Sequence, residues 1–396
     1  MNPFALLAAA AGIWWACSVA VLLLSFAAAL SHPVRRKQNA AGSGRAPLSV
    51  VVPVSFFHPG FEDAQRSLFS QDYEGLEIIL SARETESAAL VAAQRIRKEF
   101  PGVASRLVQS DFDEAASPKL NAMWQGICDA RNDLILTKDS NLCLEPGEIA
   151  DLVRYLDPET GLVSTIPIAT NPQSFAAWVE SSIINCYHAR VLMLADSAGL
   201  GFGLGKVMLF RRSDLMRAGG LECLAWALGE DMALAQAMGR IGLRTVLADC
   251  VSHQYLGRRS FSGLWQRQLR WMVIWRVQLP AAFIADILGS AIPTAAAGAA
   301  AATLFGFPPE IVAVCTVAAW FFAESVLCAA KGWPISLWSP LAFLGREVLT
   351  PILWLRACTT SEVRWAGAVH KAARRPRINS GTGHSAGPGF TRNFDR

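Results

Sequence analysis

The strongest constraint on this sequence is its apolar segments, which lie at the two ends of the chain with an ordinary mixed sequence between them. The first runs from Phe4 to Leu30 and is long enough to cross the hydrocarbon core of a bilayer. The second apolar region covers residues 279–357. Charged residues make up only 17% of the 396, a low share for a soluble domain. The distribution predicts a folded domain of residues 47–263 that is fixed to a membrane at both ends.

The N-terminal segment is predicted to be an uncleaved anchor rather than a removed signal peptide. Signal peptides carry basic residues before a shorter apolar core, whereas here Arg35, Arg36 and Lys37 follow the apolar run. Basic residues beside a membrane segment mark its cytoplasmic side. We therefore expect residues 1–36 to form a transmembrane anchor with a basic flank. The following domain is expected on the cytoplasmic face, at the inner membrane if the source is bacterial.

The C-terminal region holds about three further candidate spans, at Ala281–Leu304, Ile311–Ala329 and Leu341–Leu355. The last contains Arg346 and Glu347, which are costly against lipid, so we expect it to be re-entrant or packed against protein. Strict alternation of spans would place the basic tail of residues 358–396 outside the membrane, whereas the positive-inside rule places it inside. A re-entrant third segment resolves that conflict. The Gly- and Ser-rich end of the tail is expected to be disordered.

Within residues 47–263, runs of β-branched residues alternate with segments of helical spacing. Strands are predicted at Leu48–Val54, Leu76–Leu80, Ser105–Gln109 and Asp133–Thr137, and helices at Glu62–Ser70, Glu86–Phe100 and Lys119–Ala130. This alternation predicts an α/β fold with a mostly parallel sheet and helices on both faces. Ligands of such sheets bind beyond the carboxyl ends of the strands. The residues after Leu80 and Thr137 are therefore the first place to look for a site.

A carboxylate follows the fourth strand directly, in Lys138-Asp139-Ser140-Asn141. Residues i and i+2 of an extended turn face the same way, so Asp139 and Asn141 could hold Mg²⁺ or Mn²⁺ together with substrate phosphates. The same residue types also form ordinary turns and helix caps. His253 is a further candidate metal ligand, although a single histidine is more often a structural hydrogen-bonding group.

Adjacent acids open a predicted helix at Gly229-Glu230-Asp231, with apolar stretches on both sides. Acids in a first helical turn are well explained by their interaction with the helix dipole. A carboxyl group partly buried among apolar neighbours would instead have a raised pKa and could accept a proton from a hydroxyl group. Asp231 is thus a candidate general base.

Arg267 and Arg270 belong to residues 264–278, a segment that mixes arginine with tryptophan in the manner of a helix at a membrane interface. They share a helix face and could bind a diphosphate, with lipid phosphate as the alternative ligand. Nucleic acid is not an expected partner, because the basic residues are not interleaved with aromatic ones on one continuous face. Nine cysteines without a Cys-x-x-Cys pair predict reduced, buried thiols and no zinc site.

Taken together, these motifs resemble those of the family 2 glycosyltransferases, and most closely the ceramide glucosyltransferase group. The resemblance rests on Asp-Ser-x, Glu-Asp and (Gln/Arg)-x-x-Arg-Trp in that order, followed by membrane segments, and runs from Leu48 to Arg375. It includes Gln71-Asp72-Tyr73, the segment from Ser117 to Asn121, and Arg346-Glu347. A hopanoid-associated glycosyltransferase group shares much of the pattern.

The resemblance implies a GT-A fold and the inverting transfer of a hexosyl group from a nucleotide sugar, such as UDP-glucose, to a hydroxyl group of a membrane lipid, ceramide above all. It implies a divalent cation, Mg²⁺ or Mn²⁺, bound by Asp139 and Asn141, and Asp231 as the catalytic base. The donor site would be formed by Glu84, Lys119, Asn121, Arg267, Arg270 and Trp271. Glu84 stands where the family has an aspartate, and Asn141 is a weaker metal ligand than the aspartate of many relatives.

Other functions stay open on the sequence alone. The acceptor could be a hopanoid or diacylglycerol instead of ceramide. A processive polysaccharide synthase shares the catalytic signature but usually has more membrane spans than the four counted here. A non-enzymatic receptor or transporter would have no reason to keep Asp139, Asp231 and Arg270 together.

Overall fold

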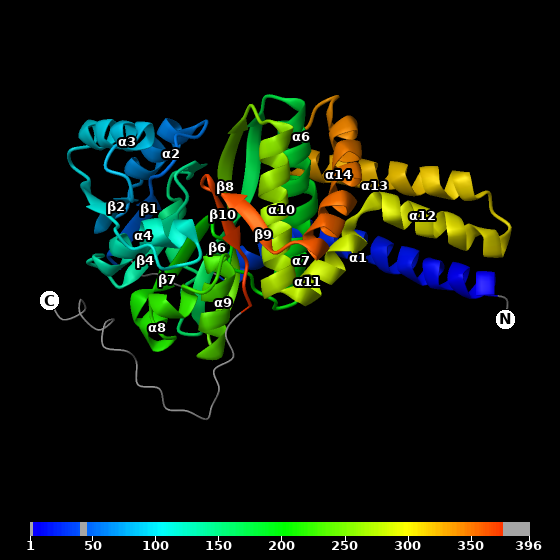
Figure 1. The fold of residues 1–396 in the computed structure, drawn as a ribbon, viewed down its shortest axis with the longest axis horizontal. Coiled ribbons are helices and arrows are strands. Elements are labelled where there is room, and N and C mark those ends of the chain that lie inside the picture. Colours follow the sequence, from blue (N-terminus) through cyan, green and yellow to red (C-terminus); the bar gives the residue numbers. More distant parts are fainter. Residues whose placement is uncertain (1–2, 40–45, 375–396) are drawn as a thin grey trace.

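The computed structural model describes residues 3–39 and 46–374, which form an elongated molecule with an α/β domain at one end and long helices at the other (Figure 1). The basic flank at residues 35–37 and most of the basic tail lie outside the residues whose side chains are described. The predicted α/β fold is confirmed. The strands and helices expected between residues 48 and 138 are all present, with ends within two residues of the prediction.

The α/β domain is built on an eight-stranded sheet with the order β3-β2-β1-β4-β7-β6-β8-β5. Its strands are β1 (Leu48–Pro53), β2 (Leu76–Ala82), β3 (Ala104–Gln109), β4 (Leu134–Lys138), β5 (Leu142–Cys143), β6 (Thr160–Pro172), β7 (Val207–Arg211) and β8 (Arg244–Gly257). Strands β1 to β4 are parallel, while β7 runs antiparallel to both β4 and β6. Every residue of β1, β2 and β4 is buried, which explains their nearly continuous apolar sequences.

Helices cover both faces of this sheet. They are α2 (Phe61–Phe69), α3 (Ala88–Glu99), α4 (Pro118–Cys128), α5 (Glu148–Val153), α8 (Arg212–Arg217), the short η2 (Leu221–Leu224) and α9 (Glu230–Arg240). One apolar core joins the sheet to α2, α3 and α5, and a second joins it to α4, α8 and α9. Helix α4 begins where the hydroxyl group of Ser117 accepts the Leu120 N–H (3.3 Å), with Pro118 in the first turn.

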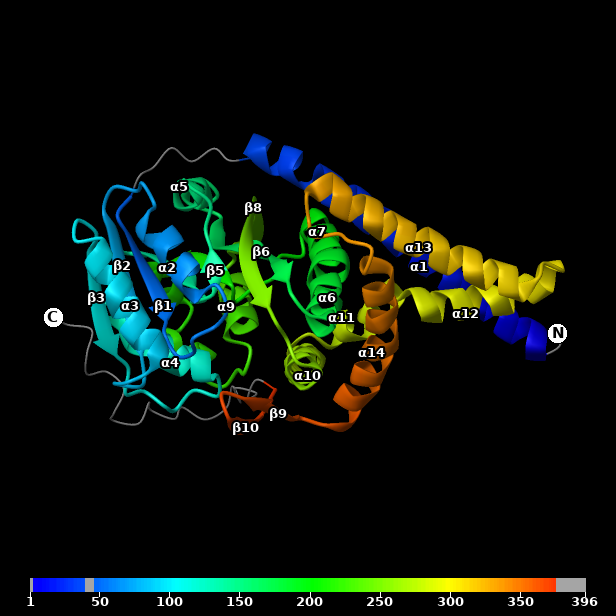
Figure 2. The ribbon, with the colours of Figure 1, turned by 90° about the horizontal axis from the view of Figure 1, so that it is seen from above.

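A second layer of helices stands between the sheet and the membrane segments (Figure 2). It consists of α6 (Phe175–Ser181), the π-helical η1 (Ser182–Ala189), α7 (Arg190–Ser197), α10 (Phe261–Gln278) and α14 (Ser339–Thr359). Helix α10 contains the segment expected at the membrane interface, and it packs against α14 and α6. π-Helical turns are rare and are found frequently at functional sites.

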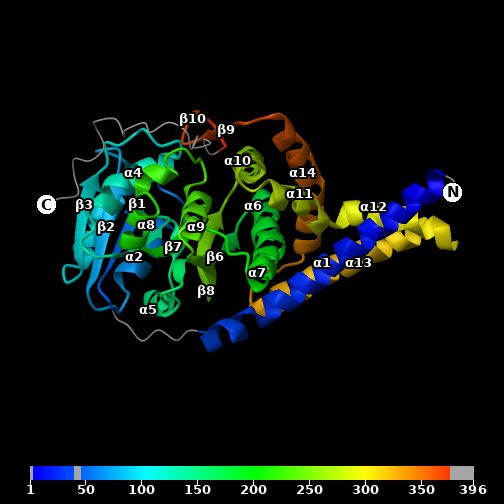
Figure 3. The same ribbon diagram turned by 90° about the horizontal axis from the view of Figure 1, so that it is seen from below.

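Within residues 3–39 and 46–374, two helices are long and apolar enough to cross a membrane, α1 (Pro3–Asn39, through its part Pro3–His32) and α13 (Pro309–Lys331). A third candidate is bent by 66° where α11 (Pro280–Ala285) and η3 (Asp286–Gly289) meet α12 (Ala291–Ala302) and η4 (Thr303–Phe305). Figures 2 and 3 show α1, α12 and α13 side by side. The expected span at residues 341–355 lies in α14, which is not among these candidates and packs against α10 and α6 within the second layer, so the segment is packed against protein.

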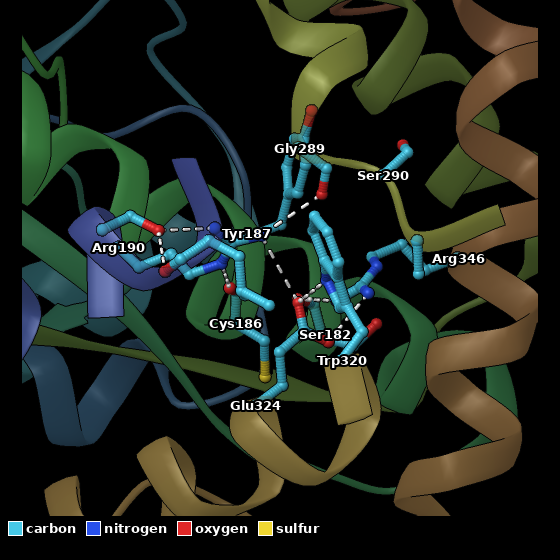
Figure 4. A network of polar contacts seen from close by, with 12 residues as sticks. Ser182, Cys186, Tyr187, Arg190, Gly289, Ser290, Trp320, Glu324 and Arg346 are labelled. Atoms are coloured by element: carbon cyan, nitrogen blue, oxygen red, sulfur yellow. Dashed lines mark hydrogen bonds and ion pairs between the residues drawn. The ribbon is translucent and has the colours of Figure 1, made fainter. Parts of the chain in front are cut away.

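The reason lies in four buried charged side chains: Arg190 of α7, Glu324 of α13, and Arg346 and Glu347 of α14. We call them the buried charge cluster. Figure 4 shows three of them converging. Arg346 Nη2 lies 2.8 Å from Glu324 Oε2 and 2.7 Å from Glu347 Oε1, and Arg190 Nη2 lies 3.6 Å from Glu324 Oε1. None is more than 1% exposed. Helix α14 therefore points its charges into protein rather than lipid.

The cluster also reaches the neighbouring helices. Arg190 donates hydrogen bonds to Ser25 Oγ of α1 (2.6 Å) and to the Gly289 carbonyl oxygen (3.2 Å), at the bend before α12. Glu347 Oε2 accepts the N–H of Ala291 (2.6 Å) in the first turn of α12. One neutral set of four charges thus fastens α1, α12 and α13 to α7 and α14 of the second layer.

Part of the predicted tail is folded. Residues 358–396 are expected to be a basic, partly disordered tail, and in its first part β9 (Glu362–Trp365) and β10 (Ala368–Lys371) pair as an antiparallel hairpin beside α10. Trp365 and Val363 pack with residues of α10, which gives this segment the apolar contacts that order it. Residues 375–396 are outside the described structure.

Candidate active site

A cavity of about 160 Å³ lies beyond the carboxyl end of β4, between the sheet and the second layer. The charged lining residues of α4, the loop before β7 and the start of α9 contact one another through Lys119 and Asp139, and we call this group the charged end. His188 of η1 contacts Trp271 and Trp275 of α10, and we call this group the aromatic or apolar end. The lining includes Lys119, Asp139, Lys206, Glu230, Asp231, Arg270, Trp271, Ile184, His188, Leu192, Ile274, Trp275 and Trp365.

Asp139 is held by two lysines at the charged end. Its Oδ1 lies 2.6 Å from Lys119 Nζ, and its Oδ2 lies 3.0 Å from Lys206 Nζ. Burial opposes ionisation of this carboxyl group, but the charges of Lys119 and Lys206 outweigh it and hold the pKa of Asp139 well below its usual range. Asp139 is therefore a permanent anion at physiological pH, placed by its position immediately after β4.

Lys119 connects Asp139 to the acidic pair at the start of α9. Its ammonium group lies 3.5 Å from Glu230 Oε1, and Glu230 Oε2 accepts a hydrogen bond from Ser117 Oγ (2.8 Å). Glu230 is thus engaged with the first turn of α4. Both acids border the cavity, but only Glu230 forms an ion pair with a lysine. Asp231 is therefore the acid of the pair that has no lysine in contact among the described residues.

The Asp231 carboxylate is fixed by backbone groups. Its Oδ2 accepts the Gly205 N–H (2.8 Å) and its Oδ1 accepts the Met232 N–H (2.8 Å). Burial, and then the negative charge of Glu230, raise its pKa to about 6. A carboxylate with this pKa is ionised at pH 7 and still basic enough to take a proton from a hydroxyl group.

A glycine-rich loop, Gly201-Phe-Gly-Leu-Gly-Lys206, brings these groups together. A Cβ atom at Gly203 would stand 2.0 Å from the Asp231 carbonyl oxygen, and one at Gly205 would stand 2.9 Å from Asp231 Oδ2. Only glycine therefore allows the loop to pass so close to α9. Sequence analysis missed Lys206 and this loop, although the three alternating glycines before a lysine were a readable signal.

Helix α10 places Arg267 and Arg270 in different surroundings. Arg270 borders the cavity, with its guanidinium carbon 4.5 Å from the centre of the Trp365 ring. Arg267 instead forms an ion pair with Glu180 of α6, and Arg259 approaches the same carboxylate at 3.5 Å. Burial, followed by repulsion from Arg267, lowers the pKa of Arg270 to about 10. No described residue hydrogen-bonds or ion-pairs with Arg270, so its N–H groups remain available for an anion in the cavity.

Two histidines that sequence analysis did not single out are affected by the site: His188 lines the cavity, and His58 lies outside the lining but within reach of the charges of Lys206 and Asp139. His188 of η1 borders the apolar end and meets Trp275 edge to face at 4.9 Å. Burial, and then Arg346, lower its pKa to about 3, so it is neutral. His58, in the loop after β1, has its pKa lowered to about 4 by burial and then by Arg259 and Lys206. Neither histidine lies in a sequence motif that would have predicted a place in or near the site.

The remaining candidates lie away from the cavity lining. The side-chain amide of Asn121 exchanges two hydrogen bonds of 2.9 Å with the backbone of Ala115, so it shapes the loop before α4. Asn141 is buried beside Asp139 but is not among the residues that border the cavity. Glu84 is exposed after β2, and His253 Nε2 lies 3.3 Å from Glu145 Oε1.

The donor set at Asp139 fits a cation that arrives with a phosphate ligand. The described residues contain no group of three or more His, Cys, Asp or Glu side chains arranged to hold a metal alone. Mg²⁺, however, is usually bound through one or two carboxylates, several waters and substrate phosphates. Asp139 is ionised, borders the cavity and meets that requirement. A cation there would replace contacts that the two lysines now make.

The chain is similar to known glycosyltransferases. It is 22% identical to ceramide glucosyltransferase 1 of Caenorhabditis elegans over 61% of this chain and 52% of that protein. It is 24% identical to the ceramide glucosyltransferase of Komagataella phaffii, over 69% of this chain and 66% of that protein. The chain thus spans between half and two thirds of the length of these relatives.

A solved structure and a family description complete the comparison. The mannosyltransferase PcManGT from Pyrobaculum calidifontis, solved with GDP-Man and Mn²⁺, aligns with a TM-score of 0.51 and 18% identity, covering 87% of this chain and 98% of its own. At that identity it supports the shared GT-A fold. The sequence model of glycosyl transferase family 21 matches residues 13–378, nearly the whole chain. The chain therefore belongs to glycosyl transferase family 21.

Proposed function

We propose that this protein transfers a hexosyl group, with inversion, from a nucleotide sugar such as UDP-glucose to the hydroxyl group of a membrane lipid. The observation that carries the proposal is the position of Asp231. Its carboxylate, with a pKa of about 6, borders one cavity whose two ends differ in character. The charged end suits a nucleoside diphosphate, and the aromatic end suits the upper part of a lipid.

The reaction follows from these positions. Asp231 accepts the proton of the lipid hydroxyl group as its oxygen bonds to the anomeric carbon. The bond between that carbon and the diphosphate oxygen breaks on the opposite face, which inverts the configuration. Lys119, Lys206 and Arg270 surround the place where the leaving diphosphate gains charge. Because no carboxylate in the described part of the chain forms an ion pair with Arg270, whereas Lys119 and Lys206 both pair with Asp139, it is the cation most available for that role.

A divalent cation, Mg²⁺ or Mn²⁺, is part of the proposal, with Asp139 as its protein ligand. The presence of Mn²⁺ beside GDP-Man in the PcManGT structure supports it. When bound, the cation would offset negative charge on the diphosphate. Asn141 is retained as a weaker candidate ligand, because it lies two residues from Asp139. Glu84, Asn121 and Arg267 are less favoured donor contacts than Lys119 and Arg270, since none of them borders the cavity.

Ceramide is the acceptor that we propose, on the basis of the names of the two curated relatives. Its apolar chains would lie towards the second layer and the membrane helices, where Leu192, Ile274 and Trp275 line the cavity. We also propose that the α/β domain lies on the cytoplasmic face, where nucleotide sugars are made. The basic residues that follow the apolar stretch Phe4–Leu30 in the sequence support that orientation.

The test offers the purified full-length protein ceramide, a hopanoid polyol and diacylglycerol in detergent, each with UDP-glucose and other nucleotide sugars. Glycosylated ceramide is expected, with transfer abolished by excess chelator and restored by added Mg²⁺ or Mn²⁺. Transfer only to the hopanoid or to diacylglycerol would overturn the choice of acceptor. Activity in excess chelator would overturn the metal proposal. Glycan chains that grow without lipid would favour a processive synthase.

A further inference from the structure

The hairpin formed by β9 and β10 closes one side of the cavity. Trp365 pairs with Ala368, and the two residues between them, Ala366 and Gly367, both have positive φ angles (51° and 79°). Two consecutive residues with positive φ angles form the two-residue hairpin turn whose twist matches that of two antiparallel strands. A two-stranded hairpin is only marginally stable in isolation. Its position therefore depends on what holds it to the rest of the protein.

Helix α10 provides the main attachment. Arg276 donates hydrogen bonds to the Thr360 carbonyl oxygen (2.9 Å) and to Ser361 Oγ (3.0 Å), at the base of the hairpin. Val363, only 3% exposed, packs in the apolar cluster that includes Met272 of the same helix. The base of the hairpin is thus fixed to the helix that also carries Arg270.

Trp365 extends from this base into the site. Its indole ring borders the same cavity as Asp139 and Asp231, and one face of the ring receives the Arg270 guanidinium at 4.5 Å. This arrangement puts an apolar wall directly beside the arginine that is free to bind an anion. The wall comes from a segment far along the chain from every catalytic motif.

We propose that Trp365 is a further residue of the transfer site, where its indole excludes water from the sugar and so sets the ratio of transfer to hydrolysis. The inference rests on the proposed glycosyl transfer. In transfer, the lipid oxygen bonds to the anomeric carbon, the bond to the diphosphate breaks, and the hydroxyl proton passes to Asp231. A water molecule in the lipid's place gives free hexose and nucleoside diphosphate by the same bond changes. A closed apolar wall suppresses that side reaction.

The second role of Trp365 is to hold Arg270. Stacking on the indole keeps the guanidinium in the cavity before the donor arrives, through the attraction between a cation and an aromatic face. Phenylalanine would keep an aromatic face at this position, whereas alanine would remove both the wall and the stacking partner. The two substitutions therefore separate a general loss of the hairpin from loss of the ring itself.

The experiment compares Trp365→Ala, Trp365→Phe and a control, Val369→Ala, whose side chain is 61% exposed on β10. Purified proteins receive labelled UDP-glucose with and without ceramide, and both glucosylceramide and free glucose are measured. Trp365→Ala should raise the ratio of hydrolysis to transfer by about tenfold or more, because water now reaches the sugar. Trp365→Phe should stay close to wild type, and the control should be unchanged.

Equal losses of transfer and hydrolysis in Trp365→Ala would overturn the inference and leave Trp365 a structural residue. If that variant does not fold, Arg276→Ala loosens the same hairpin without removing a cavity side chain. A raised ratio in Arg276→Ala supports the inference, and an unchanged ratio contradicts it. A wild-type protein that neither transfers nor hydrolyses any nucleotide sugar would refute the proposed function itself, a result distinct from the others.

Discussion

The molecule contains two networks of opposite charges that differ in what surrounds them. At the cavity, Lys119 lies between Asp139 and Glu230, and every member of the network borders open space. In the buried charge cluster, Arg346 lies between Glu324 and Glu347, with no more than 1% of any of the three side chains exposed. The first network can exchange partners with a ligand. The second has only protein partners and can only hold helices together.

The difference in surroundings shows how the same residue types can bind a ligand in one place and stabilise the fold in another. Both networks contain Arg or Lys beside Glu or Asp, and both contact the backbone: Lys119 donates to the Gly205 carbonyl oxygen, and Glu347 accepts the Ala291 N–H. A charge facing a cavity keeps its affinity for an incoming ion. A fully enclosed charge adds little net stability but is costly to leave alone. Substitutions in the first network should therefore alter turnover, and substitutions in the second should alter folding.

The largest expected effect is that of Asp231→Asn. The carboxamide keeps the shape of the side chain but cannot accept the hydroxyl proton, so transfer should fall by about 100-fold or more. Nucleotide binding should stay near wild type, and the melting temperature should fall slightly, because the carboxamide can accept only one of the two N–H groups that the carboxylate accepts. Asp151→Asn, at an exposed acid on α5, is the matched control. Turnover above about a tenth of wild type would be too high for loss of a general base and would refute the assignment.

Arg346→Met tests the other side of the comparison. It removes the cation that Glu324 and Glu347 share and leaves Glu324 only its longer contact with Arg190, which should destabilise the fold by about 3–5 kcal/mol. We expect a clear fall in the melting temperature of the detergent-solubilised protein, measured alongside Arg356→Met, an exposed arginine on the same helix. A stable Arg346→Met protein that has lost only transfer would mean that the cluster belongs to the active site.

The smallest effect is a change with pH. Asp231 acts when ionised, and its pKa of about 6 lies above the usual value of an aspartate. The maximal rate should therefore be level above pH 7 and fall about tenfold for each pH unit below 6, as the carboxylate is protonated. Parallel melting curves show whether the protein stays folded. A rate that is flat between pH 5 and 7 would contradict this pKa or the role of Asp231.

Much of the fold was predictable because short stretches of sequence indicate their own secondary structure. The β-branched run at Leu48 and the Ser117-Pro118 start of α4 have local causes, a buried strand and a helix cap, that need no distant partner. Residues 281–304 were predicted as one span, but the structure bends there by 66°. The bend lies where Arg190 and Glu347 form hydrogen bonds with the backbone between η3 and α12. No local sequence pattern predicts these contacts.

The candidate site divides in the same way. Asp139, Asp231 and Arg270 could be named because short motifs carry their chemistry. The structure added Lys206, which pairs with Asp139 across 67 residues of sequence, and Trp365, which stacks on Arg270. Arg267 looked equivalent to Arg270 on a helix face, but Glu180 of α6 takes it out of the cavity. Which arginine is free depends on a neighbour distant in sequence.

The sequence by itself determined the α/β fold, the apolar ends of the chain and the residue types that transfer requires, because each follows from composition and spacing along the chain. Tertiary structure alone decided which of those residues meet. It paired Asp139 with two lysines, placed Asp231 between a charged and an aromatic wall, and enclosed Arg346 away from lipid. Contacts of this kind join residues far apart in sequence, and their energies depend on burial that only the packed fold creates.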